Sequence, residues 1–191
     1  MTKRKLVLST RNDHKVREFQ RLLPEVELIA LPDGVNLPPE DGTTYADNAL
    51  GKARAAAAAT GIDAIADDSG IEAAELGGEP GIFSARFAGE DASDEQNLAL
   101  FEEKVSPGSK IEYVCAIAFV TADGSENVFE SRCSGQMAKA RSGNRGFGYD
   151  PVFVPDALDG SLTMADIADQ VKDTISHRGL AAAQLAAYLS A

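Results

Sequence analysis

The stretch "IDAIADDSG", residues 62–70, reads as a short buried strand, 62–67, that ends in two adjacent aspartates. It follows an alanine-rich segment, 44–60, whose composition predicts a helix that stops at a glycine. A helix that leads directly into an apolar strand is typical of α/β folds. Ligand sites in such folds gather at the carboxyl ends of strands, which favours a function for Asp67 and Asp68. The alternative is that both aspartates merely start a turn.

Strands and helices alternate along most of the chain. Strands are predicted at 6–8, 26–31, 111–121 and 127–133, with a last short strand at the end of the glycine-rich segment 143–154. Further helices are predicted from Asn12 to Pro24, from Ser93 to about Val105 and from Ser176 onward. Asp123-Gly124 is typical of a two-residue hairpin turn. The predicted fold class is therefore α/β, with a mixed β-sheet flanked by helices.

Length and charge limit the classes of protein to consider. A chain of 191 residues favours a single domain, 1–191, which can be built as two lobes with the active site in the cleft between them. The formal net charge of -12 disfavours nucleic acid as a partner, because its phosphate backbone would be repelled. No apolar run approaches the roughly 20 residues that span a bilayer, so we expect no membrane partner.

The N-terminal segment and the cysteines bear on the cellular compartment. Only Leu6-Val7-Leu8 follow the basic start of the chain before polar residues, which is too short for a signal peptide, so we expect a cytoplasmic protein. The two cysteines, Cys115 and Cys133, show none of the spacings of zinc ligands. They could be opposed across the predicted hairpin, but a cytoplasmic location predicts free thiols.

Basic residues occur at two predicted helix N-termini, where the helix dipole disfavours a cation unless an anion lies nearby. Lys15 lies in the first turn of one helix, and His177 and Arg178 open another, with Lys172 shortly before it. Backbone N–H groups at helix N-termini, together with basic side chains, form phosphate sites. For Lys15 the alternative is a solvated surface lysine.

The pair Gly51-Lys52 does not fit the phosphate loop of triphosphatases, because Ala46 stands at the required glycine and Ala53 replaces the Ser/Thr metal ligand. The loop "GFGYDP", residues 146–151, begins like a dinucleotide-binding fingerprint but does not match it, because a proline and then a strand follow its glycines. It offers aromatic rings on a flexible backbone beside Asp150. These suit stacking on a flat base and accepting a hydrogen bond from it. A tight turn with packed aromatics is equally compatible with the residues.

Carboxylates and lysines together point to phosphate chemistry. Glu40 stands on a proline-rich loop, and a Mg²⁺ ion bound with a triphosphate needs only one or two carboxylates besides the phosphate oxygens. Thr44, Asn48 and Lys52 recur every four residues and form one polar stripe on the predicted helix. Treated as an exposed side chain, Lys52 is expected to contact phosphate and to contribute little to folding stability.

Taken in order, seven segments resemble the signature segments of the Ham1-like inosine triphosphate pyrophosphatase family. They are "TRNDHK" (10–15), "EDGTTY" (40–45), "DNALGKA" (47–53), "ADDSG" (66–70), "PGIFSARFAG" (80–89), "GFGYDP" (146–151) and "SHR" (176–178). The resemblance covers nearly the whole chain.

This resemblance implies a homodimeric, Mg²⁺-dependent enzyme that hydrolyses non-standard purine nucleoside triphosphates such as ITP, dITP and XTP to the monophosphate and pyrophosphate. It implies Asp68 as the metal-linked general base and Glu40 as a second metal ligand. The implied triphosphate-binding residues are Thr10, Arg11, Asn12, Asp13, His14, Lys15, Lys52, Ser69 and Lys172. The implied base pocket consists of Phe147, Gly148, Tyr149, Asp150, His177 and Arg178.

Arg178 is expected to recognise the base, because a permanently charged donor satisfies a 6-oxo group but leaves the adenine amino group unpaired. Two segments depart from the family pattern: Arg11 stands where a glycine often follows the threonine, and Gln170-Val171 replace an acidic pair before Lys172. Two other functions stay open. One is a pyrophosphatase for other modified nucleotides, pyrimidines included, and the other is a nucleotide-binding protein without turnover.

Overall fold

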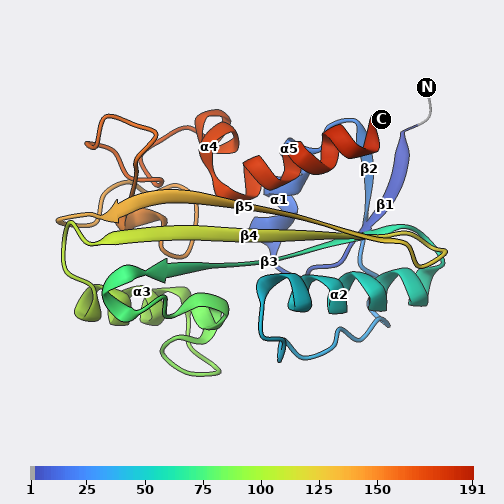
Figure 1. Ribbon diagram of the computed structural model, residues 1–191, viewed down its shortest axis with the longest axis horizontal. Helices are drawn as coiled ribbons and strands as arrows, with labels where there is room; N and C mark the ends of the chain where they lie inside the picture. The colour runs from blue at the N-terminus through green and yellow to red at the C-terminus, as the bar shows by residue number, and fades with distance from the viewer. Residues whose placement is uncertain (1–2) are drawn as a thin grey trace. The chain divides into compact units, whose positions relative to one another are not determined.

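A computed structural model describes residues 3–191 of the chain (Figure 1). Residues 1 and 2, the start of the basic N-terminal segment, lie outside the described part. The 6-stranded sheet has the strand order β2-β1-β3-β4-β5-β6. Strand β1 is parallel to β2 and to β3, whereas β5 and β6 are antiparallel. The mixed sheet predicted from the sequence is therefore confirmed.

The strands are β1 (Arg4–Leu8), β2 (Val26–Ala30), β3 (Ala64–Ala73), β4 (Lys110–Val120), β5 (Glu126–Met137) and β6 (Phe153–Pro155). The α-helices are α1 (Asp13–Leu22), α2 (Tyr45–Thr60), α3 (Asp94–Lys104), α4 (Asp169–Ile175) and α5 (His177–Leu189). Short 3₁₀ helices are η1 (Ala74–Leu76), η2 (Gly81–Arg86) and η3 (Asp150–Val152). Within residues 3–191, the helices all fall short of the length and apolar character needed to cross a membrane.

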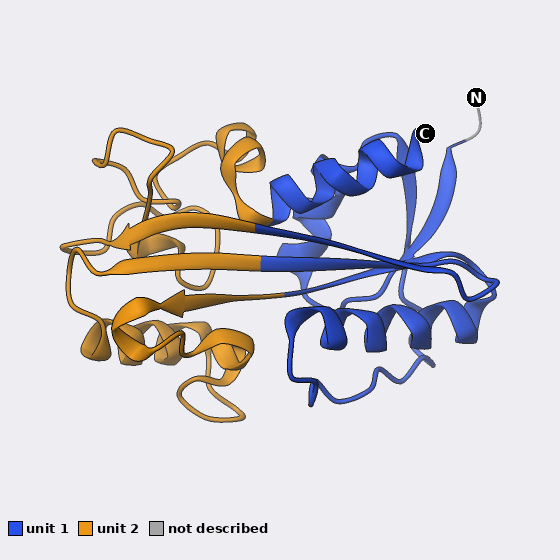
Figure 2. Ribbon diagram, viewed as in Figure 1, with its two compact units in different colours: residues 1–68, 115–131, 178–191 blue, residues 69–114, 132–177 orange. Residues whose placement is uncertain are grey.

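The chain divides into two compact units (Figure 2). Unit 1 comprises residues 1–68, 115–131 and 178–191, and unit 2 comprises residues 69–114 and 132–177. Each unit is thus assembled from segments that are far apart in the sequence. The division agrees with the two lobes expected from the chain length, and the single domain over residues 1–191 stays a prediction.

In unit 1, helices cover both faces of the sheet (Figure 1). Leu6 and Leu8 of β1 pack on one face with Phe19 of α1 and Leu185 of α5. Val7 lies between them in the sequence and packs on the other face with the buried alanines of α2. Successive side chains of a strand point to opposite faces, so this alternation follows directly from the extended backbone.

The N-terminus of α1 and the C-terminus of α2 are capped as the sequence predicts, and α2 also has an N-terminal capping box that was not predicted. The Asn12 side chain accepts hydrogen bonds from the backbone N–H groups of His14 and Lys15. Thr44 opens α2 with a capping box, and Gly61 ends it in the left-handed conformation at φ 66. The predicted helix 44–60 is confirmed.

Strand β3 extends beyond its predicted range of 62–67. It runs over Ala64–Ala73, through both aspartates and the glycine that follows them. The reason is that fully buried apolar side chains resume at Ile71, so tertiary packing overrides the local turn signal. The turn alternative for the aspartates is therefore wrong, and they do not end their own strand. Because β1 ends at Leu8, which pairs with Ile65, the aspartates still lie beyond the end of that parallel neighbour.

One further prediction needs correction. The loop between β4 and β5 spans residues 121–125 and is longer than the expected two-residue turn. The backbone N–H of Thr121 donates to the Ser125 carbonyl at 2.9 Å and closes this loop. The predicted final helix is confirmed as α5, and a separate short helix that was not predicted, α4, precedes it. Ser176 is the C-cap residue of α4, and α5 begins directly after it.

Both cysteines are buried free thiols, as predicted. In unit 1, the Sγ atom of Cys115 lies 3.9 Å from a carboxylate oxygen of Asp67. Burial, reinforced by that negative charge, raises the pKa of the Cys115 thiol well above its usual value. Burial likewise raises the pKa of Cys133, in unit 2, to about 12. Both sulfurs are therefore protonated at neutral pH.

The core of unit 2 is rich in aromatic side chains. Helix α3 begins with the predicted capping box of Ser93 and Gln96. Its Phe101 is fully buried and meets the ring of Tyr149 edge-on, with 5.0 Å between ring centroids. Phe153 of β6 is also fully buried. Tyr149 and Phe153 thus hold the C-terminal part of the glycine-rich segment against this core.

Candidate functional site

Asp67 is the most deeply buried carboxylate of unit 1, with 1% of its surface exposed. Its Oδ2 atom accepts hydrogen bonds from Nε and Nη2 of Arg178, at 3.0 and 2.8 Å, and lies 3.2 Å from Nζ of Lys15. Burial alone would raise the pKa of Asp67, but the charges of Lys15 and Arg178 outweigh it and hold the pKa well below its usual value. Asp67 is therefore an ionised anchor for two cations.

This arrangement explains the basic residue at the start of α1. Only 14% of the Lys15 side chain is exposed, so the surface-lysine alternative is wrong. The anion that offsets its unfavourable place at a helix N-terminus is Asp67.

Arg178 links three elements of unit 1. Its side chain is 2% exposed, and its Nη1 atom donates to Oε2 of Glu18 at 2.7 Å. Glu18 comes from α1, Asp67 from β3 and Arg178 from the first turn of α5. The structure thus surrounds the guanidinium with carboxylates, which makes Arg178 a structural cation. Its expected role in recognising a base stays a prediction.

Asp68 points to a second group of side chains in unit 1. Its Oδ2 atom accepts a hydrogen bond from Nδ2 of Asn48 at 2.9 Å, and its Oδ1 atom lies 3.9 Å from Nζ of Lys52. The same ammonium group forms a short ion pair with Glu40. Burial raises the pKa of Asp68 by more than Lys52 and Asn48 lower it. Two carboxylates therefore converge on one cation.

Lys52 is buried, with 9% of its side chain exposed, and the expectation of an exposed side chain is wrong. Helix α2 turns its polar stripe toward β3 because Glu40 and Asp68 neutralise the ammonium there. Burial alone would lower the pKa of Lys52, but the charges of Asp67, Glu40 and Asp68 raise it overall. Lys52 is therefore charged at neutral pH.

Asn48 was not among the predicted site residues, yet it ties the loop that carries Glu40 to Asp68. Its Oδ1 atom accepts the backbone N–H of Gly42 at 2.9 Å, while its Nδ2 atom donates to Asp68. A Cβ atom on Gly42 would lie 2.6 Å from Cβ of Asp47 and 2.7 Å from the Asn48 amide oxygen. Only glycine fits here. The polar stripe of α2 was the signal that pointed to Asn48.

The other residues of the segment 10–15 make contacts away from the buried aspartates. Asn12 caps α1, while Asp13 and His14 are exposed. Arg11 extends along the proline-rich loop and donates to the Val35 carbonyl at 3.0 Å. Thr10 accepts the backbone N–H of Asn12 at 3.2 Å. Of this predicted set, the structure brings only the Lys15 side chain to the buried aspartates.

We call these side chains the unit 1 cluster. Its members are Lys15, Glu18, Glu40, Asn48, Lys52, Asp67, Asp68 and Arg178.

In unit 2, Asp150 is the centre of a second group. Its Oδ2 atom accepts from Nζ of Lys172 at 2.6 Å and from the backbone N–H of Phe147 at 2.9 Å. The Lys172 ammonium lies 5.2 Å from the centroid of the Phe147 ring. Gly146 has a φ of +70, and a Cβ there would lie 1.9 Å from Oδ2 of Asp150, so the loop needs glycine at this position.

The remaining predicted base-pocket residues divide between this group and the core. Tyr149 points inward and donates to the Ser84 carbonyl at 2.7 Å, so the packed-aromatic alternative is correct for this ring. The ring of His177 stacks on Tyr113, with 4.5 Å between centroids and an angle of 12°. Gly148 is a turn residue at φ +61. Ser69, which was predicted to contact the triphosphate, is half-buried on β3.

We call the second group the unit 2 cluster. Its members are Tyr113, Phe147, Asp150, Lys172 and His177.

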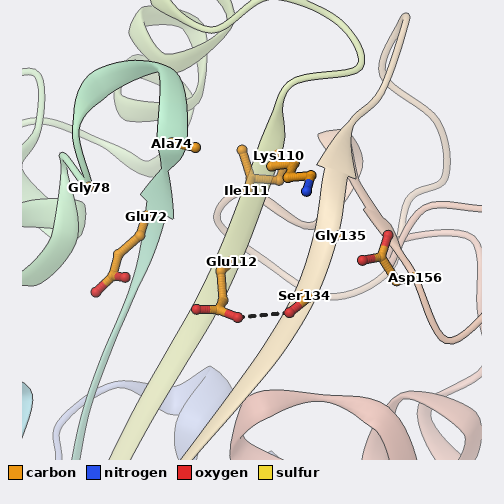
Figure 3. A pocket seen from close by; sticks show the side chains of 9 residues that line it. All are labelled: Glu72, Ala74, Gly78, Lys110, Ile111, Glu112, Ser134, Gly135 and Asp156. Atoms are coloured by element: carbon orange, nitrogen blue, oxygen red, sulfur yellow. Dashed lines mark hydrogen bonds between the residues drawn. The ribbon is translucent and has the colours of Figure 1, made fainter.

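A separate pocket of about 360 Å³ also lies in unit 2 (Figure 3). Its lining is Glu72, Ala74, Gly78, Lys110, Ile111, Glu112, Ser134, Gly135 and Asp156. Glu112 accepts a hydrogen bond from Ser134 at 2.7 Å, and Arg132 forms ion pairs with both Glu72 and Glu112. None of the predicted site residues belongs to this lining.

The donor set around Lys52 suits a hard cation. Glu40 and Asp68 already hold one positive charge between them, and carboxylate oxygens are the ligands that Mg²⁺ prefers. Within residues 3–191 no three His, Cys, Asp or Glu side chains gather as a metal site. A Mg²⁺ ion bound together with nucleotide phosphates takes only one or two protein carboxylates, so the pair fits this ion.

Comparison with known proteins identifies the family. Residues 6–188 match the Ham1 family. The chain is 44% identical to the dITP/XTP pyrophosphatase of Cutibacterium acnes, over 93% of this chain and 92% of that protein. It is 41% identical to the dITP/XTP pyrophosphatase of Deinococcus radiodurans, over 96% of this chain and 92% of that protein.

Solved structures agree with the sequence relatives. The Staphylococcus aureus Ham1 protein has a TM-score of 0.82 and 36% identity, and a Coxiella burnetii HAM1 protein has a TM-score of 0.84 and 35% identity. Each alignment covers 98% of both chains. On these grounds the chain belongs to the Ham1 family.

Proposed function

We propose that this protein hydrolyses non-standard purine nucleoside triphosphates, such as ITP, dITP and XTP, to the monophosphate and pyrophosphate, with Mg²⁺ as cofactor. The observation that carries the proposal is the convergence of Glu40 and Asp68 on the Lys52 ammonium, with Asp67 and Lys15 adjoining. Relatives at 44% and 41% identity carry the name dITP/XTP pyrophosphatase, which supports the same substrates for this chain.

In this reaction a water attacks the α-phosphorus and pyrophosphate leaves. Asp68 is the proposed base that orients and deprotonates the water, and Asn48 holds its carboxylate in one orientation. Lys15 and Lys52 place positive charge where negative charge develops on the phosphoryl oxygens and the leaving group. Glu40 and Asp68 are the proposed ligands of Mg²⁺, which would supply Lewis-acid polarisation of the phosphates.

The unit 2 cluster has the chemistry to recognise a 6-oxo purine. Such a base presents an N1–H donor beside an O6 acceptor, whereas adenine presents an acceptor beside a donor. The Asp150 carboxylate accepts and the Lys172 ammonium donates, so the pair matches the 6-oxo pattern and opposes the adenine pattern. Phe147 supplies a ring for stacking. We therefore propose that this pair, rather than Arg178 alone, selects the base.

A triphosphate panel tests the function. We expect turnover of ITP, dITP and XTP with equal amounts of monophosphate and pyrophosphate, and much slower turnover of ATP. Excess EDTA is expected to abolish turnover, and added Mg²⁺ to restore it. Preferred turnover of a modified pyrimidine triphosphate would identify the alternative pyrophosphatase. Tight nucleotide binding without any product would identify a binding protein.

Lys52 is the next test, because the structure places it between two carboxylates. Lys52→Met is expected to lower kcat/KM for ITP about 10- to 100-fold, as for loss of a charge-assisted contact. It is also expected to lower the free energy of unfolding by about 1–3 kcal/mol, because Glu40 and Asp68 lose their partner. Steady-state kinetics and urea unfolding measure the two effects.

The matched control for this variant is Lys5→Met, since 62% of the Lys5 side chain is exposed and its ion pair with Glu27 is at the surface. That variant should change neither quantity appreciably. Full activity of Lys52→Met would exclude a role of Lys52 in phosphate binding.

We further propose a homodimer in the cytoplasm, as the family resemblance implies. Sedimentation equilibrium at several protein concentrations measures the mass in solution. A mass of one chain at all concentrations would contradict the dimer.

A further inference from the structure

Tyr113 contacts two members of the proposed base-recognition group at once. It lies on β4, is 7% exposed, and its hydroxyl donates to Oδ1 of Asp150 at 3.2 Å. Its ring lies 4.5 Å from the His177 ring at an angle of 12° and 4.5 Å from the Phe153 ring at 25°, between centroids. The stacked rings connect β4 to the first residue of α5.

The hydroxyl holds the oxygen of Asp150 that the rest of the cluster leaves uncontacted. Phe147 and Lys172 both bind the Oδ2 atom. The Asp150 carboxylate turns about its Cβ–Cγ bond, and this rotation moves both oxygens together. The bond from Tyr113 adds a donor at Oδ1, so rotation away from the observed orientation breaks hydrogen bonds at both oxygens.

We propose that Tyr113 is a positioning residue for base selection, which fixes the carboxylate plane of Asp150 through its hydroxyl and the plane of His177 through its ring. The inference rests on the proposed function, in which Asp150 accepts the N1–H of a 6-oxo purine. Tyr113 itself need not touch the base. Its effect is to keep the acceptor lone pairs of Asp150 aimed in one direction, because hydrogen bonds weaken steeply as their angle departs from linear.

A packing role alone would not use the hydroxyl. The strand is apolar from Val114 onward, and a phenylalanine would fill the same place between Phe153 and His177. A buried hydroxyl is kept where it has a specific partner, and here that partner is Asp150.

The experiment compares Tyr113→Phe, which keeps the ring stack and removes the hydroxyl, with Tyr113→Leu, which removes both. Tyr188→Phe is the matched control, because it removes the same atom from an exposed ring whose hydroxyl accepts from Asn127. For each protein, kcat and KM are measured with ITP and with ATP, together with the unfolding midpoint.

For Tyr113→Phe we expect the ratio of kcat/KM for ITP to that for ATP to fall about five- to tenfold, as for one lost hydrogen bond of ordinary net strength, because Tyr113 acts on the base only through Asp150. The change should lie mainly in KM for ITP, since the water and the phosphates are untouched. Tyr113→Leu should reduce the ratio further, and Tyr188→Phe should leave it unchanged. An unchanged ratio in a folded Tyr113→Phe variant, or equal losses for ITP and ATP, would overturn the proposal.

A second measurement separates this inference from the proposed function. The backbone N–H of Phe147 binds Asp150, so its hydrogen exchange should accelerate in Tyr113→Phe and stay at the wild-type rate in Tyr188→Phe. Wild-type enzyme without a preference for ITP over ATP would contradict base recognition by Asp150. Unaltered exchange at Phe147 would contradict the positioning of Asp150 by Tyr113.

Discussion

Replacing Asp68 by asparagine is expected to lower kcat for ITP by a factor on the order of 10² to 10⁴, the usual cost of removing a general base. The amide has nearly the shape of the carboxylate but lacks its basicity and its negative charge. Nucleotide binding should persist, because Lys15 and Lys52 keep their charges. Stopped-time assays for pyrophosphate and equilibrium binding of ITP measure the two properties separately.

The same variant also tests the place of Asp68 in the unit 1 cluster. The Oδ2 atom of Asp68 accepts a hydrogen bond from Asn48, and an asparagine can keep that bond if its amide oxygen faces Nδ2. The fold should therefore tolerate the change. Asp63→Asn is the matched control. Asp63 directly precedes β3, forms an ion pair with Arg4 at 2.7 Å and does not belong to the unit 1 cluster. Near-normal turnover of Asp68→Asn would remove the assigned base.

The local patterns predicted elements well where the cause was local. The Asn12 cap, the Ser93 capping box and the glycine stop at Gly61 depend on neighbouring residues, and all three are present. The length of β3 was missed because its continuation depends on burial of Ile71, which is a tertiary effect. Lys52 was misjudged for the same reason, since a helical stripe does not show what it packs against.

The partners of the site were the least predictable part. Asn48 binds Asp68 over a separation of 20 residues, Tyr113 binds Asp150 over 37 residues and Arg178 binds Glu18 over 160 residues. A single sequence contains no local signal for such pairs. The basic residue at the start of α1 did carry a signal, because the helix dipole required an anion nearby, and Asp67 provides it.

The second large effect is expected at Arg178, where Arg178→Met should lower the free energy of unfolding by about 3–5 kcal/mol. Removing one partner of a buried ion pair leaves the other charge uncompensated, and this is more costly than the pair itself is stabilising. Here Glu18 loses the Nη1 donor and Asp67 loses two hydrogen bonds while keeping Lys15. Methionine has a similar length, so little of the loss arises from an empty cavity.

The pH dependence of this difference has a definite sign. The pKa of Asp67 is depressed in the folded protein, so its contribution to stability is present above the usual aspartate value of 3.8 and is lost as the pH falls through the folded value. Wild type and Arg178→Met should therefore differ most in stability near neutral pH. Their unfolding free energies should approach one another in acid, which urea titrations at a series of pH values would measure.

Arg54→Met is the control that isolates burial. Arg54 also binds a carboxylate through two nitrogens, at 2.6 and 2.7 Å from Glu126, but 54% of its side chain is exposed. The same substitution there should lower the unfolding free energy by less than about 1 kcal/mol, as for surface ion pairs. Equal losses at both positions would contradict the structural role of Arg178.

Base recognition by Arg178 is tested with Arg178→Lys, which keeps a positive charge beside the carboxylates of Glu18 and Asp67. An unchanged ratio of kcat/KM for ITP to that for ATP would assign Arg178 to these carboxylates alone. A fall in that ratio at retained stability would assign Arg178 to the base.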